Sequence, residues 1–282
     1  MAELLDGKAI SKILREEIKL EIAAWKEKGK QPKLAVILVG SDPASVVYAK
    51  SKQKAAENMG MAYELFALAE DTEESVVLDL IAYLNEDEKV HGIMIELPLP
   101  KHLAKEKIMA AVRPEKDVDG CHPINRGYIL SGEEGLFPAT PLSCIELLLR
   151  SGVEISGKHA VIVGRGETVG KPLIFLILKY NATVTICHSR TVDLGSFTRQ
   201  ADILISAVGK INLITRDMVK SGAVVVDAGI NETADGICGD VDFKGVQEVA
   251  GRISPVPGGV GALTTAMIMR NVLKGITLQG GY

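Results

Sequence analysis

Short apolar runs alternate with longer amphipathic segments along the whole chain. In the first half, the runs at 34–39, 63–68 and 90–97 have the length and continuity of strands buried in a parallel sheet. The segments between them carry apolar residues at helical spacing. Helices are therefore predicted over the ranges 8–28, 41–59, 76–84 and 104–112. Strands that alternate with helices indicate a parallel α/β sheet.

The second half repeats this alternation. A connecting helix is predicted over 142–150, after a domain boundary near Thr140-Pro141. The end of the chain, from Ala262 to Lys274, is again helical in pattern. The predicted strands of this half are 160–163, 183–187, 203–207 and 223–227. The chain is long enough for two domains of ordinary size.

A glycine-rich turn joins the strand 160–163 to the apolar, helix-like residues 173–178. It contains Gly164, Gly166 and Gly170. A turn of this kind presents backbone N–H groups and a helix N-terminus to a dinucleotide pyrophosphate. The spacing GxGxxxG differs from the usual GxGxxG, so a purely structural turn is the alternative. A P-loop is excluded, because a proline stands where that motif requires Ser or Thr.

The next strand indicates which dinucleotide is bound. NAD-selective sites place an acidic residue about twenty positions after the glycine turn, where it holds the ribose hydroxyls. Here no Asp or Glu occurs between Glu167 and Asp193, and the strand ends in CHSR. Arg165, Ser189 and Arg190 could hold a 2′-phosphate by charge-assisted hydrogen bonds. The sequence therefore favours NADP, with solvated surface arginines as the alternative.

Tyr48 and Lys52 are four residues apart on the predicted helix after strand 34–39, so they share one face. That helix begins near the carboxyl end of a parallel strand, where α/β proteins bind ligands. A lysine beside a tyrosine in a partly buried cleft can lose its proton more readily and act as a base. A solvated basic face is the alternative. Glu96, at the end of strand 90–97, is either a cleft residue near Lys52 or an exposed strand-end residue.

Two further loops contain candidate residues. Asp117 and Asp119 lie in KDVDGCHP, where acidic turn residues often accept hydrogen bonds from their own backbone. Neither calcium-loop nor zinc spacing is present around them, so no metal site is predicted. The loop 255–261, PVPGGVG, precedes the last helix. Its residues Gly258 and Gly259 allow close approach by a flat ligand, or form only a tight turn.

Composition narrows the function classes. Of the 282 residues, 47% are hydrophobic and 24% charged, as in a soluble globular protein, and the net charge of −4 implies no nucleic-acid partner. The 4% of aromatic residues argues against a base-stacking platform. No signal peptide or membrane-spanning run is seen, so no membrane association is expected. The 4 cysteines form no CxxC pair, which predicts a reduced, cytoplasmic location.

Eight segments, taken in this order, closely resemble the methylenetetrahydrofolate dehydrogenase/methenyltetrahydrofolate cyclohydrolase family. They are SDPASVVYAKSKQKAAENMG, IELPLP, PEKDVDG, PATP, VIVGRGETVGKP, ATVTICHSRT, GDVDF and PVPGGVG, and they span nearly the whole chain. The resemblance implies an N-terminal α/β catalytic domain over 1–140, a Rossmann dinucleotide-binding domain over 141–262, and a cleft between them. It further implies that the last helix, within 263–282, packs back on the first domain, and that the protein is a homodimer.

The same resemblance implies NADP-dependent oxidation of 5,10-methylenetetrahydrofolate to the methenyl form, followed by hydrolysis to 10-formyltetrahydrofolate. Tyr48 and Lys52 then match the folate-site tyrosine and the catalytic lysine, Asp119 matches the aspartate that holds the pterin, and Glu96 completes the catalytic set. The cofactor contacts it implies are Gly164, Arg165, Ser189 and Ile230, to which the residue pattern above adds Gly166 and Arg190. The substrate contacts implied in the last loop are Pro257, Gly258 and Gly259.

Two departures from the family pattern bear on activity. Glu96 stands where the family usually has glutamine. A carboxylate near Lys52 would favour the charged ammonium and weaken it as a base, so we expect cyclohydrolase activity to be reduced or differently tuned. Gly166 replaces a usual serine and removes one hydroxyl contact, which leaves use of NAD open.

Three alternatives therefore remain beside the bifunctional enzyme. The first is a dehydrogenase with weak or no cyclohydrolase activity that uses NADP or NAD. The second is a non-catalytic nucleotide-binding protein, which the presence of Lys52 and Asp119 disfavours. The third is an unrelated Rossmann dehydrogenase for a hydroxy acid or a shikimate-like substrate. The combination of Tyr48-x-x-x-Lys52, KDVDG and PGGVG argues against it.

Overall fold

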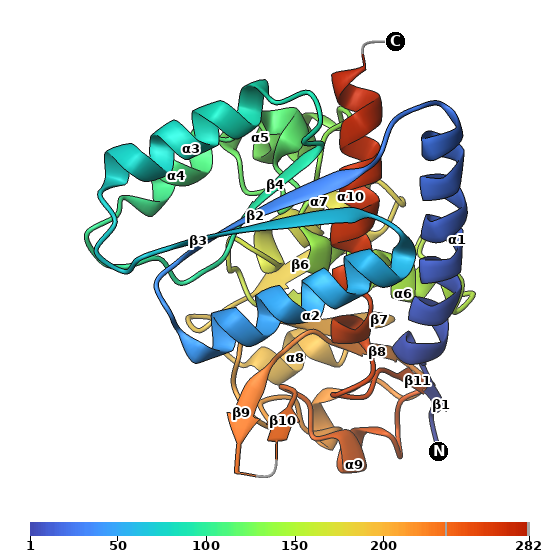
Figure 1. Cartoon of the computed structure of the whole chain (residues 1–282). Coiled ribbons are helices and arrows are strands. Elements are labelled where there is room, and N and C mark those ends of the chain that lie inside the picture. The colour runs from blue at the N-terminus through green and yellow to red at the C-terminus, as the bar shows by residue number, and fades with distance from the viewer. Residues whose placement is uncertain (235, 281–282) are drawn as a thin grey trace. The chain divides into compact units, whose positions relative to one another are not determined.

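The computed structural model describes residues 1–234 and 236–280, which form two compact units (Figure 1). Unit 1 comprises Met1–Lys12 and Pro138–Thr264. Unit 2 comprises Ile13–Phe137 and Thr265–Tyr282. Each unit is therefore assembled from two separate stretches of the chain.

Unit 2 is a small parallel α/β sheet. Its three strands are β2 (Lys33–Val39), β3 (Ala62–Leu68) and β4 (Gly92–Ile95), in the order β3-β2-β4. The chain moves from β2 to one neighbour and then to the other, so the switch point of the topology lies between β2 and β4. Its helices are most of α1 (Gly7–Glu27), α2 (Pro43–Met59), α3 (Glu74–Glu86), α4 (Lys105–Ala111), the 3-10 helix η1 (Pro114–Lys116), α5 (Pro123–Ser131) and nearly all of α10 (Thr264–Gln279).

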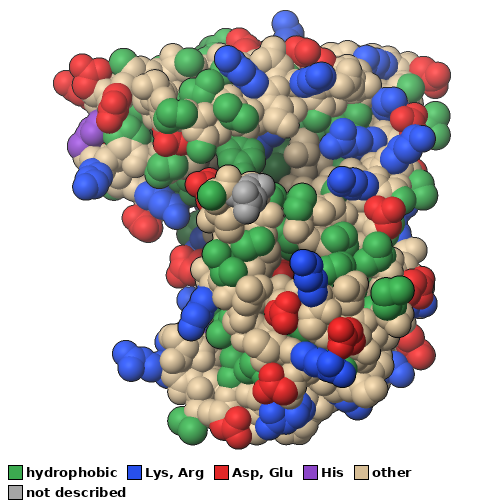
Figure 2. Space-filling model, turned by 90° about the horizontal axis from the view of Figure 1, so that it is seen from below, with side chains coloured by type: hydrophobic (Ala, Val, Ile, Leu, Met, Phe, Trp, Pro, Cys, Tyr) green, Lys and Arg blue, Asp and Glu red, His purple; other side chains and the backbone are tan. Residues whose placement is uncertain are grey.

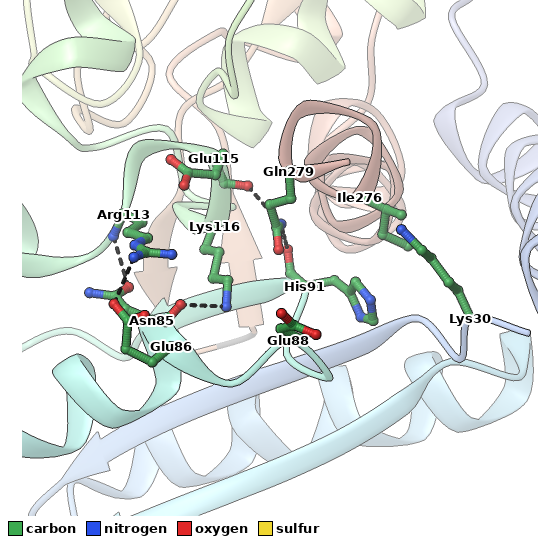
Figure 3. Close-up of a pocket in the computed structure, with 10 residues that line it drawn as sticks. All are labelled: Lys30, Asn85, Glu86, Glu88, His91, Arg113, Glu115, Lys116, Ile276 and Gln279. Carbon is green, nitrogen blue, oxygen red and sulfur yellow. Dashed lines mark hydrogen bonds and ion pairs between the residues drawn. The ribbon is translucent and has the colours of Figure 1, made fainter. Parts of the chain in front are cut away.

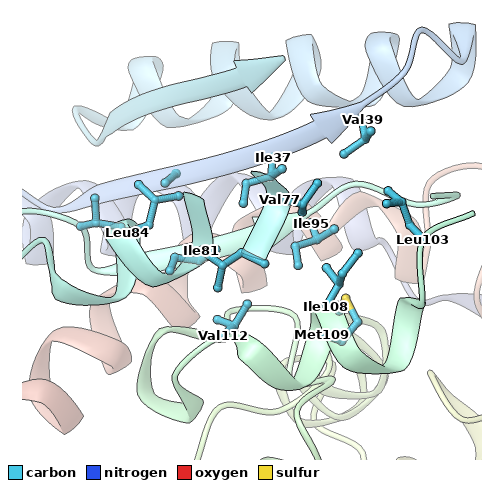
Figure 4. Close-up of a cluster of buried hydrophobic side chains, with 13 residues drawn as sticks. Ile37, Val39, Val77, Ile81, Leu84, Ile95, Leu103, Ile108, Met109 and Val112 are labelled. Atoms are coloured by element: carbon cyan, nitrogen blue, oxygen red, sulfur yellow. The ribbon is translucent and has the colours of Figure 1, made fainter. Parts of the chain in front are cut away.

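The core of unit 2 follows from the two-residue period of its strands. On β2, Ala35, Ile37 and Val39 point to one face, where they pack with buried residues of α3 and α4 (Figure 4). The intervening residues of β2 are equally buried, because the other face of the sheet is also covered. A Cβ on Gly92 in β4 would lie 3.0 Å from Val272 of α10, so this helix covers that other face. This double coverage explains the continuous apolar runs in the sequence.

Polar contacts fasten α10 within unit 2. The buried side chain of Asn271 donates to the carbonyl oxygens of Val118 (2.7 Å) and Phe137 (2.8 Å). Near the helix end, Gln279 donates to the carbonyl oxygens of His91 and Glu115. The C-terminal helix thus joins segments more than a hundred residues earlier in the sequence.

Unit 1 contains a larger parallel sheet. Its strand order is β1-β11-β8-β7-β5-β6. Strands β9 and β10 follow β8 in the sequence and form a separate antiparallel pair. The strands are β1 (Glu3–Leu4), β5 (His159–Val163), β6 (Thr183–Cys187), β7 (Ile203–Ser206), β8 (Val224–Asp227), β9 (Asn231–Thr233), β10 (Gly236–Cys238) and β11 (Arg252–Ile253). The helices are α6 (Ala139–Arg150), α7 (Gly170–Leu178), α8 (Leu194–Thr198), α9 (Phe243–Val246) and the 3-10 helices η2 (Arg216–Met218) and η3 (Val260–Ala262).

The N-terminus departs from the predicted division at residue 140. Residues 1–12 belong to unit 1, because Glu3 and Leu4 form a strand that pairs in parallel with β11. The backbone N–H of Leu5 also donates to the carbonyl oxygen of Ile253. A two-residue strand has too little apolar pattern to be recognised in the sequence.

The two-domain α/β fold class is confirmed, with repeated parallel β–α units in both halves. Helix α2 begins and ends as its sequence predicts: Asp42 caps its first turn through Ser45, Pro43 opens it, and Gly60 adopts the left-handed conformation at its end. Over the described residues, no helix has the length and apolar character needed to cross a membrane.

Candidate active site

Lys52 and Glu96 form a buried ion pair in unit 2. The Nζ atom of Lys52 lies 2.7 Å and 2.8 Å from the two carboxylate oxygens of Glu96. Their side chains are 11% and 5% exposed. Lys52 comes from α2, which follows β2, and Glu96 directly follows β4. The pair therefore marks the topological switch point of this sheet, where α/β proteins bind ligands.

Tyr48 and Tyr63 flank this pair. Lys52 Nζ lies 5.9 Å from the centre of the Tyr48 ring, and the Tyr48 side chain is exposed. Tyr63, on β3, donates its hydroxyl to the carbonyl oxygen of Ala49 (3.0 Å). Burial, and secondly the Glu96 carboxylate, raise the pKa of Tyr63 above its ordinary value. Sequence reasoning assigned Tyr63 only to a strand, because its nearness to Glu96 depends on the pairing of β3 with β2.

Asp119 completes this group of ionisable residues. Burial, together with the charges of Asp117 and Glu96, raises its pKa to about 7, while Lys52 acts in the opposite direction. The neighbouring Asp117 is buried and accepts hydrogen bonds from the backbone N–H of His122 (2.7 Å) and from Asn125 (3.0 Å). Asp117 therefore fixes the loop, while Asp119 remains available for a ligand.

A cavity of about 430 Å³ lies at the carboxyl edge of the unit 1 sheet. Its walls come from the segments that follow β5, β6 and β7, and β5 lies between the other two strands. The chain passes from β5 to β6 on one side and then to β7 on the other, so this is the switch point of the larger sheet. The lining residues are Val163, Gly164, Arg165, Gly166, His188, Ser189, Thr191, Leu194, Ala207, Val208, Lys210 and Leu213.

Two of the three glycines in the turn are required by close packing. A Cβ on Gly164 would lie 2.3 Å from the carbonyl oxygen of Ala207, and Gly164 has φ = 124°. A Cβ on Gly170 would lie 2.1 Å from the carbonyl oxygen of Gly164. By contrast, a Cβ on Gly166 would meet no atom within 4 Å. Gly166 is therefore not required by the fold, and a serine would fit there.

Four of the six predicted cofactor residues line the cavity, namely Gly164, Arg165, Gly166 and Ser189. Arg190 is exposed and donates its backbone N–H to His188, and Ile230 is 57% exposed; neither is a lining residue. None of the described lining residues is acidic, which suits a ligand with several phosphate groups. Sequence reasoning missed the wall formed by Ala207, Val208 and Lys210, because only the adjacency of β5 and β7 places it there.

The loop 255–261 lies in unit 1, against the first residue of α1. A Cβ on Gly7 would be 2.0 Å from the carbonyl oxygen of Gly259, and a Cβ on Gly259 would be 2.6 Å from that of Pro255. Gly258 has φ = 113°. Packing within unit 1 is therefore sufficient to explain both glycines, and a substrate contact by Pro257, Gly258 and Gly259 stays a prediction.

A further cavity of about 430 Å³ lies in unit 2, near the end of α10 (Figure 3). Its polar groups bind one another. Lys116 Nζ donates to the carbonyl oxygens of Leu84, Asn85 and Asp87 at the end of α3, and Arg113 pairs with Glu86. These contacts stabilise the end of α3, so this cavity is not the candidate site.

The remaining surface and the cysteines add little to the chemistry. On the face shown in Figure 2, basic and acidic side chains are interspersed rather than gathered by sign. Within residues 1–234 and 236–280, no group of three or more His, Cys, Asp or Glu side chains could hold a metal ion. All four cysteines are free thiols, and burial raises the pKa of both Cys121 and Cys144 to about 12.

Comparison with known proteins gives matches over nearly the whole chain. Residues 5–119 match the family model described as tetrahydrofolate dehydrogenase/cyclohydrolase, catalytic domain, and residues 138–279 match that of its NAD(P)-binding domain. The chain is 74% identical over 279 residues to bifunctional protein FolD 2 of Desulfitobacterium hafniense, covering 99% of this chain and 98% of that protein.

Solved structures agree with these matches. The bifunctional FolD enzyme of Campylobacter jejuni superposes with a TM-score of 0.96 at 46% identity, covering 99% of this chain and 100% of that one. The Trypanosoma brucei methylenetetrahydrofolate dehydrogenase-cyclohydrolase, solved with NADP cofactor and an inhibitor, superposes with a TM-score of 0.92 at 34% identity. That match covers 100% of this chain and 99% of the other.

Proposed function

Because this chain belongs to the tetrahydrofolate dehydrogenase/cyclohydrolase family, we propose that it oxidises 5,10-methylenetetrahydrofolate with NADP and hydrolyses the methenyl product to 10-formyltetrahydrofolate. The observation that carries the proposal is the buried Lys52–Glu96 pair beside Asp119, at the switch point of the unit 2 sheet. It is supported by a cavity without acidic lining residues at the switch point of the unit 1 sheet.

The unit 1 cavity fits NADP. Gly164 and Gly170 carry no side chains and let the turn pack closely after β5, in the place where a Rossmann turn meets the pyrophosphate. Arg165 and Ser189 provide donors for a 2′-phosphate. NADP held there would supply the hydride acceptor for the methylene carbon of the substrate.

In unit 2, we assign folate binding to Tyr48, Lys52 and Asp119. The exposed ring of Tyr48 offers a flat apolar face for an aromatic ring of the substrate. Asp119, with its pKa raised to about 7, can accept a hydrogen bond from the pterin or, when protonated, donate one to it. The nitrogen lone pair next to the methylene carbon drives hydride departure, so the protein mainly has to orient the substrate.

Hydrolysis requires water to add to the methenyl carbon with loss of one proton to solvent. One carbon–nitrogen bond then breaks as the remaining hydroxyl proton passes to the released nitrogen and the carbonyl of the formyl group forms. Lys52 is the group proposed to move these protons. In this chain its Nζ atom is bound to both carboxylate oxygens of Glu96, so Lys52 must leave this ion pair to act on the substrate. A second candidate follows from this pair: a dehydrogenase with weak cyclohydrolase activity.

One assay tests both candidates. Purified enzyme is given methylenetetrahydrofolate with NADP and, separately, with NAD, while reduced cofactor, methenyl and formyl products are followed. If neither NADP nor NAD is reduced, the dehydrogenase assignment is contradicted. Methenyl build-up that persists above the spontaneous-hydrolysis control would favour the second candidate.

A matched pair of variants tests the role of Lys52. Lys52→Gln should abolish enzymatic hydrolysis of methenyltetrahydrofolate. Lys54→Gln, an exposed lysine two positions along the same helix, should leave it unchanged. Equal hydrolysis by both variants would remove Lys52 from the mechanism.

We also propose that the enzyme works as a homodimer in the cytoplasm. Exposed apolar side chains of unit 1, among them Leu149 and Leu178, and four free thiols are compatible with this. Sedimentation velocity at micromolar concentration tests the assembly, since a monomer would contradict it.

A further inference from the structure

Asp240 is a fully buried carboxylate surrounded by hydrogen-bond donors. Its Oδ2 accepts from the hydroxyl of Ser206 (3.0 Å) and the backbone N–H of Val208 (2.7 Å). Its Oδ1 accepts from the backbone N–H of Lys210 (2.8 Å) and the side-chain amide of Asn231 (3.2 Å). Two of these four donors are therefore backbone groups of a single short segment, residues 208–210.

That segment is a wall of the unit 1 cavity. Val208 and Lys210 both line it, together with Ala207. The carbonyl oxygen of Ala207 is also the atom that leaves no room for a Cβ on Gly164. A shift of the wall would therefore change both the shape of the cavity and the packing of the glycine turn.

We propose that Asp240 is a positioning residue for the cofactor, which holds residues 207–210 in the conformation that receives NADP. This inference rests on the proposed function. Asp240 does not line the cavity, so it acts only through the backbone that it binds.

Asp240 is itself held in place. Its backbone N–H donates to Oδ1 of Asp227 (3.0 Å), and that carboxylate also accepts from the N–H groups of Gly229 and Val241. A Cβ on Gly229 would lie 2.2 Å from the carboxylate of Asp240. Position 229 therefore has no room for a side chain while Asp240 occupies its place.

The position requires a carboxylate rather than an amide. Both oxygens face donors, and an asparagine would turn an NH₂ group towards one of the two pairs. The hydroxyl of Ser206 can rotate to accept, but the N–H groups of Val208 and Lys210 cannot. In either orientation of the amide, one partly buried hydrogen bond of the wall loses its acceptor.

The test is Asp240→Asn in the full-length enzyme, with Asp242→Asn as the matched control. Asp242 lies two residues further on, and its carboxylate caps α9 through the N–H of Gly245, which asparagine can also do. Asp240→Asn should raise the KM for NADP about five- to tenfold, with kcat at saturating NADP within about twofold. The control should leave both unchanged.

A purely structural role gives a different pattern, in which kcat or the active fraction falls while the KM for NADP stays constant. That result would overturn the proposal. Because wild-type enzyme is assayed alongside, absence of NADP reduction there would count against the proposed function instead.

Amide hydrogen exchange of the wild-type enzyme tests the same point without a variant, in case Asp240→Asn does not fold. The amides of Val208 and Lys210 should exchange about as slowly as those of strand β7. Exchange at the rate of an unprotected turn would show that Asp240 does not hold the wall.

Discussion

The Lys52–Glu96 ion pair makes Glu96→Gln the most informative single substitution. The family resemblance places glutamine at this position, so the variant restores the usual residue with nearly the same shape. The amide still accepts a hydrogen bond from Lys52 but carries no charge. The charge–charge attraction between the two side chains is thereby removed.

The size of the effect follows from the geometry. Two unit charges with N–O distances of 2.7 and 2.8 Å attract by about 6 kcal/mol at an effective dielectric constant of about 20. Loss of hydration offsets much of this, because both side chains are almost fully buried. Hydrogen bonds to charged groups typically contribute a net free energy of about 1.5–3 kcal/mol, and we take this as the net strength of the Lys52–Glu96 interaction. At tenfold per 1.4 kcal/mol, Glu96→Gln should speed methenyl hydrolysis roughly ten- to hundredfold.

The assay follows the disappearance of methenyltetrahydrofolate, corrected for spontaneous hydrolysis. Dehydrogenase turnover is measured on the same preparations and should change by less than about threefold, since hydride transfer needs no base. Glu106→Gln, which removes an exposed carboxylate on α4, is the control. If the wild-type enzyme hydrolyses the substrate at least as fast as Glu96→Gln, the reasoning is wrong. Equal acceleration of both reactions would instead indicate altered folate binding.

Three further predictions concern stability. Gly164→Ala should lower the free energy of unfolding in urea by about 3 kcal/mol or more, because the added Cβ meets the carbonyl oxygen of Ala207. Gly166→Ala should change it by no more than about 0.5 kcal/mol. Similar urea midpoints for the two variants would contradict the packing argument. Asn271→Ala leaves two buried carbonyl groups without a donor and should cost about 2–4 kcal/mol in the same measurement. Lys274→Ala on the same helix removes only a partly exposed ion pair with Glu134 and should cost less than about 1 kcal/mol. The raised pKa of Asp119, about 7, means that the folded state retains a proton that the unfolded state has released, so this residue's contribution to stability is lost as pH rises from about 4 through 7. Asp119→Asn should therefore reduce the loss of unfolding free energy between pH 5 and pH 8 by up to about 3 kcal/mol, and an unchanged loss would refute the assignment.

The sequence predicted elements well where local patterns are strong. The main strands and α2 lie within a few residues of their predicted bounds, because buried parallel strands are continuous apolar runs and α2 has clear start and stop residues. The short strands β1, β9, β10 and β11 were not predicted, because each has only two or three residues. β1 and β11 also depend on pairing partners far away in the sequence, whereas β9 and β10 pair with each other.

The candidate site shows the same division. Gly164 and Glu96 could be selected because each stands at the end of a predicted strand, and Lys52 because it shares a helix face with Tyr48. Nothing local indicates that Tyr63 lies near Glu96, or that Asp240 binds the wall after β7. Those contacts arise from strand order, and strand order is fixed by long-range packing rather than by short sequence patterns.

The division of each unit between two stretches of chain has a consequence for folding during synthesis. Residues 13–137 leave the ribosome early, but their core remains open until α10 arrives, and Asn271 then binds the carbonyl next to Asp119. Apart from Met1–Lys12, unit 1 emerges only from Pro138 onward, and it is complete at Thr264. The unit that starts later can therefore finish first. A ribosome-bound nascent chain long enough to expose Thr264 but not α10 should resist protease in unit 1 while remaining cleavable within residues 13–137.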